Sequence, residues 1–255
     1  MNTYQILKKE LRNYFFSPIA YVFLAFFLVI VGYFFIISML RYGEMTMFAS
    51  QAPQMMNKFN GENMILSPLF SIMLFLMIFL IPVITMRLFS EERKLGTIEL
   101  LFTYPITEWQ MVLGKFLAAV AVLLLIFGFS LVYIIIYSKY FEPTAGVIIS
   151  GYLGTFLVSL SFLSFGMWVS SLTSDQVTSA LATLGGLLLL WVSGAGQATF
   201  PGPFGNFLKE ISIMDHSEQF VRGIIDTHDV VYFLCFIGFF VFLTVQSLET
   251  RKWRG

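Results

Sequence analysis

Long apolar segments alternate with short polar ones along most of the chain. A membrane-spanning helix needs about 20 predominantly apolar residues. Six segments meet this requirement without any acidic, basic or histidine side chain: residues 19–40, 69–86, 116–137, 147–169, 178–197 and 230–248. The pattern predicts an all-α integral membrane protein, with six transmembrane helices in a single domain over residues 1–255.

The ends of these segments carry helix signals. Ser17 and Ser67 each precede a proline, which suits the start of a helix. Pro82 lies inside the second span and should kink it, because proline lacks an N–H. Residues 1–18 place Tyr4, Leu7, Leu11, Tyr14 and Phe15 at helical spacing. We expect an amphipathic helix in the membrane interface there; a simple topogenic anchor is the alternative.

Small residues in the fourth span, Gly151, Gly154, Ser159 and Ser161, have two interpretations. They let neighbouring helices approach closely, or they line a pathway. We favour close helix packing.

Composition supports a membrane protein and narrows its partners. Apolar residues make up 58% of the chain and charged residues 12%, against roughly 45–50% and 25% in soluble domains. The formal net charge is zero, so the balance of charge indicates no nucleic-acid partner. The chain is expected to contact membrane lipid, and its single cysteine, Cys235, excludes an intrachain disulfide.

Basic residues favour one orientation. With the N-terminus inside, ten lysines and arginines lie on the inner segments and five on the outer segments. The inner ones are Lys8, Lys9, Arg12, Arg87, Arg93, Lys94, Lys115, Arg251, Lys252 and Arg254, and the outer ones are Arg41, Lys58, Lys139, Lys209 and Arg222. By the positive-inside rule both termini should be cytoplasmic.

The inner segment 87–115 combines charged and large apolar residues. Gly96 suits a left-handed helix end, residues 97–101 can form a short helix, and Pro105 ends it. Thr107 and Gln110 have the spacing of a capping box for the next helix. A solvated connector has no need of so many apolar residues, so we expect this short helix to dock into a groove on a soluble partner.

The stretch SEERKLGTIELLFTYPITEWQMVLGK closely resembles the coupling segment of ABC-2-type (type V) ABC transporter permeases. The matching positions are Ser90, Glu91, Glu92, Arg93, Gly96, Thr97, Glu99, Leu100, Leu101, Pro105, Ile106, Thr107, Gly114 and Lys115. The segments FFSPIAYVF and QFVRGIIDTHDVVYF resemble the branch of gliding-motility-associated and nitrous-oxide-reductase-maturation permeases.

This resemblance implies a permease of the bacterial cytoplasmic membrane. Two permease copies, identical or related, would form the pathway, and each would dock on one of two ABC ATP-binding subunits. The ATPase-coupling residues implied are Glu91, Glu92, Arg93, Gly96, Thr97, Glu99, Leu100, Leu101 and Pro105. The loop 198–229 would form short extracytoplasmic helices that gate the exit, with Pro201, Pro203, Phe220, Gly223 and Asp226 as gate residues.

The sequence carries no G-x-x-x-x-G-K-[ST] phosphate loop. We therefore expect no catalysis and no cofactor in this chain, with ATP and Mg²⁺ held by the partner subunit. The outer loop holds His216 and His228 among several aspartates, but no i, i+4 histidine pair. We predict no metal site, and interpret this loop as solvated, with a capping box at Asp215 and Glu218 and a further cap at Asp229.

Three function classes remain: an ABC exporter permease, which we favour, a secondary transporter, and a membrane subunit that converts ATP hydrolysis into a mechanical or assembly signal. The absence of ionisable residues from the predicted spans disfavours the second class. The third shares the coupling segment, and would be indicated by an extracytoplasmic auxiliary protein as a partner.

Overall fold

A computed structural model describes residues 3–49, 61–94, 96, 107–142, 144–195 and 202–252, and these contain helices and no strand. The elements are α1 (Thr3–Phe16), α2 (Pro18–Ala49), the π-helix η2 (Glu62–Leu66), α3 (Ser67–Thr85), α4 (Ser90–Lys94), α6 (Glu108–Tyr140), α7 (Ala145–Leu172), α8 (Gln176–Val192), the 3₁₀-helix η3 (Ser193–Ala195), α10 (Pro203–Ile211), α11 (Ile213–Val221) and α12 (Thr227–Lys252).

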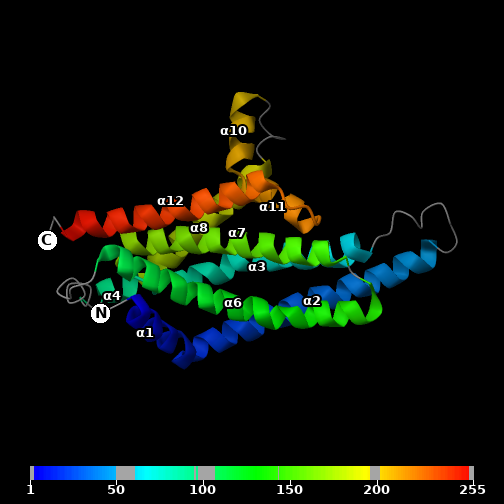
Figure 1. Ribbon diagram of the computed structural model, residues 1–255, viewed down its shortest axis with the longest axis horizontal. Coiled ribbons are helices and arrows are strands. Elements are labelled where there is room, and N and C mark those ends of the chain that lie inside the picture. Colours follow the sequence, from blue (N-terminus) through cyan, green and yellow to red (C-terminus); the bar gives the residue numbers. More distant parts are fainter. Residues whose placement is uncertain are drawn as a thin grey trace.

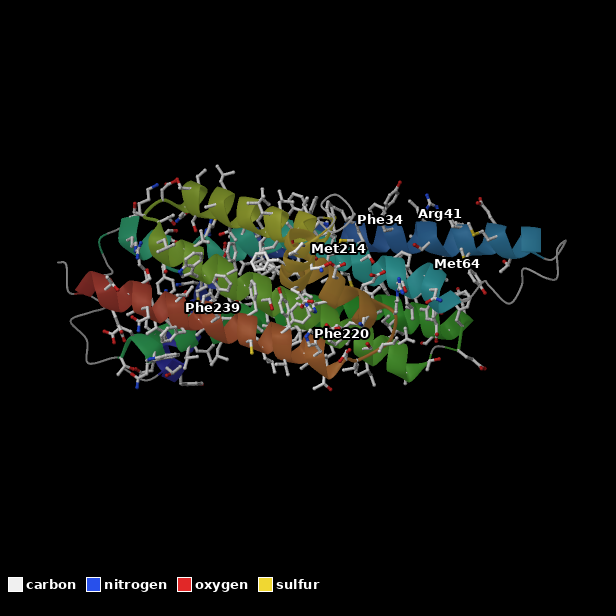
Figure 2. All side chains as sticks on the ribbon, turned by 90° about the horizontal axis from the view of Figure 1, so that it is seen from above. Phe34, Arg41, Met64, Met214, Phe220 and Phe239 are labelled. Carbon is white, nitrogen blue, oxygen red and sulfur yellow. The ribbon has the colours of Figure 1, made fainter. Side chains whose placement is uncertain are left out.

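The long helices run side by side along the longest axis of the molecule (Figure 1). Both termini lie at one end of this bundle, together with α1 and α4, and α10 projects from its side (Figure 1). Helices α3 and α7 lie at the centre, with many fully buried side chains. Helix α2 is more exposed: Phe34 and Arg41 project from its outer edge (Figure 2).

Five helical segments of the described chain are long and apolar enough to cross a membrane: Ala20–Met47, Glu62–Lys94, Glu108–Tyr140, Ala145–Leu172 and Thr227–Thr250. They contain or largely cover five of the six predicted spans. The remaining one, residues 178–197, falls mainly on α8, which has 17 residues. At ~1.5 Å per residue this helix is about 26 Å long, slightly less than the roughly 30 Å hydrocarbon core of a bilayer.

Helix α8 ends earlier than predicted because its end meets α11. A Cβ atom on Gly194 would lie 2.6 Å from the Ser212 hydroxyl oxygen, and Ser212 caps the N-terminus of α11. The chain leaves the α-helix at this contact through the 3₁₀ turn η3.

The second predicted span differs at its start. Ser67 is not an N-cap, because the π-helix η2 runs directly into α3 and the Ser67 hydroxyl donates to the Val221 carbonyl at 3.3 Å. The other end of α3 agrees with the predicted span to within one residue. Helix α3 ends at Thr85, and the Ser170 hydroxyl then accepts from the amides of Phe89 and Ser90 at 3.2 and 3.3 Å.

The small residues of α7 are packing positions, as favoured from the sequence. A Cβ atom on Gly151 would lie 2.1 Å from the Phe70 ring, and one on Gly154 would lie 2.2 Å from Cβ of Phe220. Ser159 and Ser161 are buried and donate to carbonyls one turn earlier in α7. Helices α3 and α11 can therefore lie directly against the α7 backbone.

Candidate functional site

A buried ion cluster joins three helices at the end of the bundle where the termini lie. The Lys115 ammonium is 2.8 Å from a Glu10 carboxylate oxygen and 2.9 Å from a Glu92 carboxylate oxygen. The same ammonium lies 5.3 Å from the centre of the Phe89 ring. The Lys115 side chain is 2% exposed, and those of Glu10 and Glu92 are 11% and 13% exposed. The cluster ties α6 to both α1 and α4.

Local sequence explains how α1 reaches the cluster. A Cβ atom at Gly114 would lie 2.9 Å from Ile6 and 3.2 Å from the Thr3 carbonyl oxygen, so only glycine allows this approach without a shift of α1. The Tyr14 hydroxyl then donates to the Ile84 carbonyl of α3 at 3.0 Å. At the start of α6, Thr107 and Gln110 form the capping box predicted from the sequence.

On its other side α4 contacts the turn between α7 and α8. The Arg93 guanidinium donates to the Thr173 carbonyl at 3.3 Å, and the Lys94 ammonium is 3.7 Å from an Asp175 carboxylate oxygen. Hydrogen bonds from Thr178 and the nearby Lys94 charge hold the pKa of the Asp175 carboxyl below its usual value. Helix α4 is thus held from two sides.

The predicted coupling residues divide into two groups. Glu91, Glu92 and Arg93 lie on α4, and Gly96 follows it with φ +67°, the left-handed conformation expected from the sequence. The other predicted positions lie outside the described residues: Thr97, Glu99, Leu100, Leu101 and Pro105.

The Glu92 carboxylate faces Lys115 within this chain. Glu91 and the cluster residues Glu10, Glu92 and Lys115 all line a cavity of about 480 Å³ between α1, α3 and α6. Glu92 therefore has a structural role that the sequence did not reveal.

The predicted gate residues lie on or near α10 and α11. Pro203 begins α10, whereas Pro201 lies outside the described residues. Phe220 is buried, over the middle of the bundle (Figure 2), and the Ser150 hydroxyl donates to its carbonyl at 3.0 Å. Gly223 has φ +90°, and a Cβ atom there would lie 2.8 Å from Val147. Asp226 accepts from the His228 amide at 2.9 Å.

Two predicted features of this loop are wrong. Ser212, not Asp215, caps α11, and its hydroxyl accepts from the Asp215 amide at 3.2 Å. Asp229 is not a solvated cap: it is 3% exposed, and a carboxylate oxygen lies 2.6 Å from Nδ1 of His216. Sequence reasoning missed this pair because the two residues are 13 positions apart and belong to different helices.

A second cavity, of about 830 Å³, lies between α3, α8 and α11 on the side of the loop. Its walls include Ser71, Trp191, Met214, Asp215 and Glu218. It combines apolar surface with Asp215 and the Glu218–Arg222 ion pair beside the predicted gate.

The described part of the bundle contains five helices that are long and apolar enough to cross a membrane, and the Lys115 cluster joins helices at one end of it. These features define a multi-pass membrane protein. The family model described as "ABC-2 family transporter protein" matches residues 4–247, and the chain belongs to this family.

Among curated proteins, the chain is similar to "Probable multidrug ABC transporter permease YbhR" of Escherichia coli strain K12 and of Escherichia coli O157:H7. Each is 32% identical over 96 residues, which cover 38% of this chain and 26% of the relative. The match thus spans about a quarter of the relatives' length. The narrower placement in the gliding-motility and nitrous-oxide-reductase-maturation branch stays a prediction.

Proposed function

We propose that this chain is the membrane-spanning subunit of an ABC exporter and acts as a dimer with two separate ATP-binding subunits. Six spans would cross the bacterial cytoplasmic membrane, and the basic inner segments favour cytoplasmic termini. The observation that carries the proposal is the Lys115 cluster, because it connects the predicted coupling segment to α1 and α6.

The proposed mechanism is mechanical transmission through α4. The ATPase would contact the segment 97–105 and displace α4 during ATP binding and hydrolysis. Separating Lys115 from Glu92 would break one of the two ion pairs of a buried ammonium, which is costly. The cluster therefore resists separation, and α1 and α6 should follow α4. The contacts of Arg93 and Lys94 extend the same connection to α7 and α8.

The burial of α7 and the exposure of α2 support the proposed dimer. The small residues of α7 are covered within one copy, so they offer no polar path of their own. Helix α2 exposes large apolar residues such as Phe26, Val29 and Tyr33. Lipid would cover part of this apolar surface, and a second copy of the chain would cover the rest. The pathway would then lie between the two copies, with α11 near the outer end of the pathway.

The test separates docking on the ATPase from transmission. Glu99→Ala should remove a contact with the ATPase, so less ATP-binding subunit should co-purify with the tagged chain from its host membranes. Glu92→Gln should leave co-purification intact, because this carboxylate faces Lys115, but should lower vanadate-sensitive ATP hydrolysis by the complex. Glu218→Gln, at the opposite side of the chain, serves as the matched control.

Co-purification of a subunit that carries a G-x-x-x-x-G-K-[ST] loop with the unmodified chain is the result expected. If no such subunit accompanies the chain, the proposed function fails. If it does, and both variants match the unmodified chain in both assays, the coupling route proposed here is wrong.

A further inference from the structure

Three potential metal ligands come together where α11 meets α12. His216 lies on α11, and His228 and Asp229 lie in the first turn of α12. One ligand atom from each lies within 4.8 Å of the others. His216 and Asp229 are buried, while the His228 side chain is 70% exposed.

The hydrogen bonds of His216 leave an unusual pair of atoms facing each other. Its Nε2 is 3.2 Å from the Glu210 carbonyl oxygen, which can only accept a hydrogen bond. A neutral imidazole therefore carries its proton on Nε2, and Nδ1 presents a lone pair. This lone pair faces the Asp229 carboxylate oxygen at 2.6 Å. Two electron-rich atoms at this distance need a cation between them.

Two further observations favour a metal ion over a proton alone. Nδ1 of His228 is 3.6 Å from the same Asp229 oxygen, so a third donor is already near. The other Asp229 carboxylate oxygen, Oδ2, is buried and has no hydrogen-bond partner among the residues that the structure describes. A proton shared by His216 and Asp229 would involve neither Nδ1 of His228 nor Oδ2 of Asp229.

We propose that this cluster binds a divalent transition-metal ion of the zinc class through His216 Nδ1, His228 Nδ1 and the Asp229 carboxylate. Imidazole nitrogen and carboxylate oxygen are ordinary zinc ligands, and a water would complete four-coordination. The bond from His216 Nε2 to a backbone carbonyl is the supporting contact that orients ligating histidines. This inference goes beyond the proposed function and does not depend on it.

Binding requires the ligand atoms to rearrange, because they now lie within 4.8 Å of one another and the longest separation must close by up to about 1.4 Å. Zinc bonds of about 2.0–2.1 Å place two tetrahedral ligand atoms about 3.4 Å apart. The distance of 3.6 Å from His228 to Asp229 is close to this value. The 2.6 Å distance from His216 to Asp229 must open by less than about 1 Å, which a rotation of the carboxylate can supply. The bound ion would fasten α11 to α12.

The experiment uses the full chain, purified in detergent, freed of any histidine tag and stripped with a chelator. Zinc chloride is the probe, and competition with a fluorescent zinc chelator gives the affinity. Cobalt(II) substitution adds the absorption bands of a tetrahedral site. Cys235→Ala, which removes the only thiol, and Glu218→Gln are the controls, and both should bind zinc as the unmodified chain does.

We expect one zinc ion per chain and at least a tenfold loss of affinity in His228→Ala and in Asp229→Asn, since even the loss of a supporting partner costs about 10–100-fold. His228 is exposed, so its variant should fold even if the Asp229 variant does not. Absence of zinc binding by the unmodified chain would overturn the proposal. Equal binding by His228→Ala would overturn it too, and would leave a proton between His216 and Asp229.

Discussion

Replacing Lys115 with methionine gives a direct test of the buried cluster. Methionine has a similar length and no charge, so it keeps most of the packing against Phe89 and α1. The carboxylates of Glu10 and Glu92 would lose their buried cation, and only the half-exposed Lys9 ammonium, 3.8 Å from a Glu92 carboxylate oxygen, would remain beside them. Both carboxylates are largely buried, at 11% and 13% exposure, and water can therefore solvate them only in part.

The expected cost follows from this burial. Removing one partner of a buried ion pair costs ~3–5 kcal/mol. Glu92→Gln should cost less, about 1–3 kcal/mol, because Lys115 keeps its contact with Glu10 at 2.8 Å. With ~2–4 °C of melting temperature per kcal/mol for a chain of this size, Lys115→Met should lower the midpoint by roughly 6–20 °C. Tryptophan fluorescence of the detergent-solubilised chain would follow the transition, with Trp109 on the same helix.

The fully neutral variant is the matched control. Glu10→Gln, Glu92→Gln and Lys115→Met combined leave no buried charge, and whole clusters replaced in this way are often neutral in stability. We expect the combined variant to melt above Lys115→Met alone, which is strong non-additivity. If the three substitutions simply add, the cluster does not act as a unit and the reasoning is wrong.

Three other substitutions test separate parts of the account. Gly96→Val should destabilise the chain by ~1–2 kcal/mol because φ is +67° there, whereas Gly96→Asn should be nearly neutral in the same thermal assay. Gly154→Ala should cost ~1–3 kcal/mol by pushing Phe220 and α11 away, and Gly146→Ala, which meets no atom, should not. In a cysteine-free background, an impermeant thiol reagent added to intact cells should label Arg222→Cys and leave Lys94→Cys unlabelled.

Local patterns predicted a large part of the fold. The apolar runs located the long helices, because length and hydropathy are properties of a single segment. The capping box at Thr107 and Gln110 and the left-handed Gly96 were equally readable, since each depends on residues three or fewer positions apart. The same holds for the close approach of helices at Gly151 and Gly154.

Contacts between distant residues could not be predicted in this way. Glu10 and Lys115 are 105 positions apart, and neither has a local signal that identifies the other as its partner. The start of the second span was placed too late for a similar reason. Glu62 looks unsuitable for a membrane helix, but its carboxylate accepts from the Thr144 amide at 2.7 Å, at the end of the bundle away from the termini (Figure 1). Tertiary contacts decided both cases.

The central claim is that the segment after α4 contacts an ATP-binding subunit. A photo-crosslinking amino acid at position 100 tests it most directly in native membranes, with position 140 as the control because Tyr140 is 75% exposed at the opposite end of α6. The account predicts a crosslink from position 100 to a polypeptide with a G-x-x-x-x-G-K-[ST] loop, and none from position 140. Crosslinks to that polypeptide from position 140, with none from position 100, would contradict it.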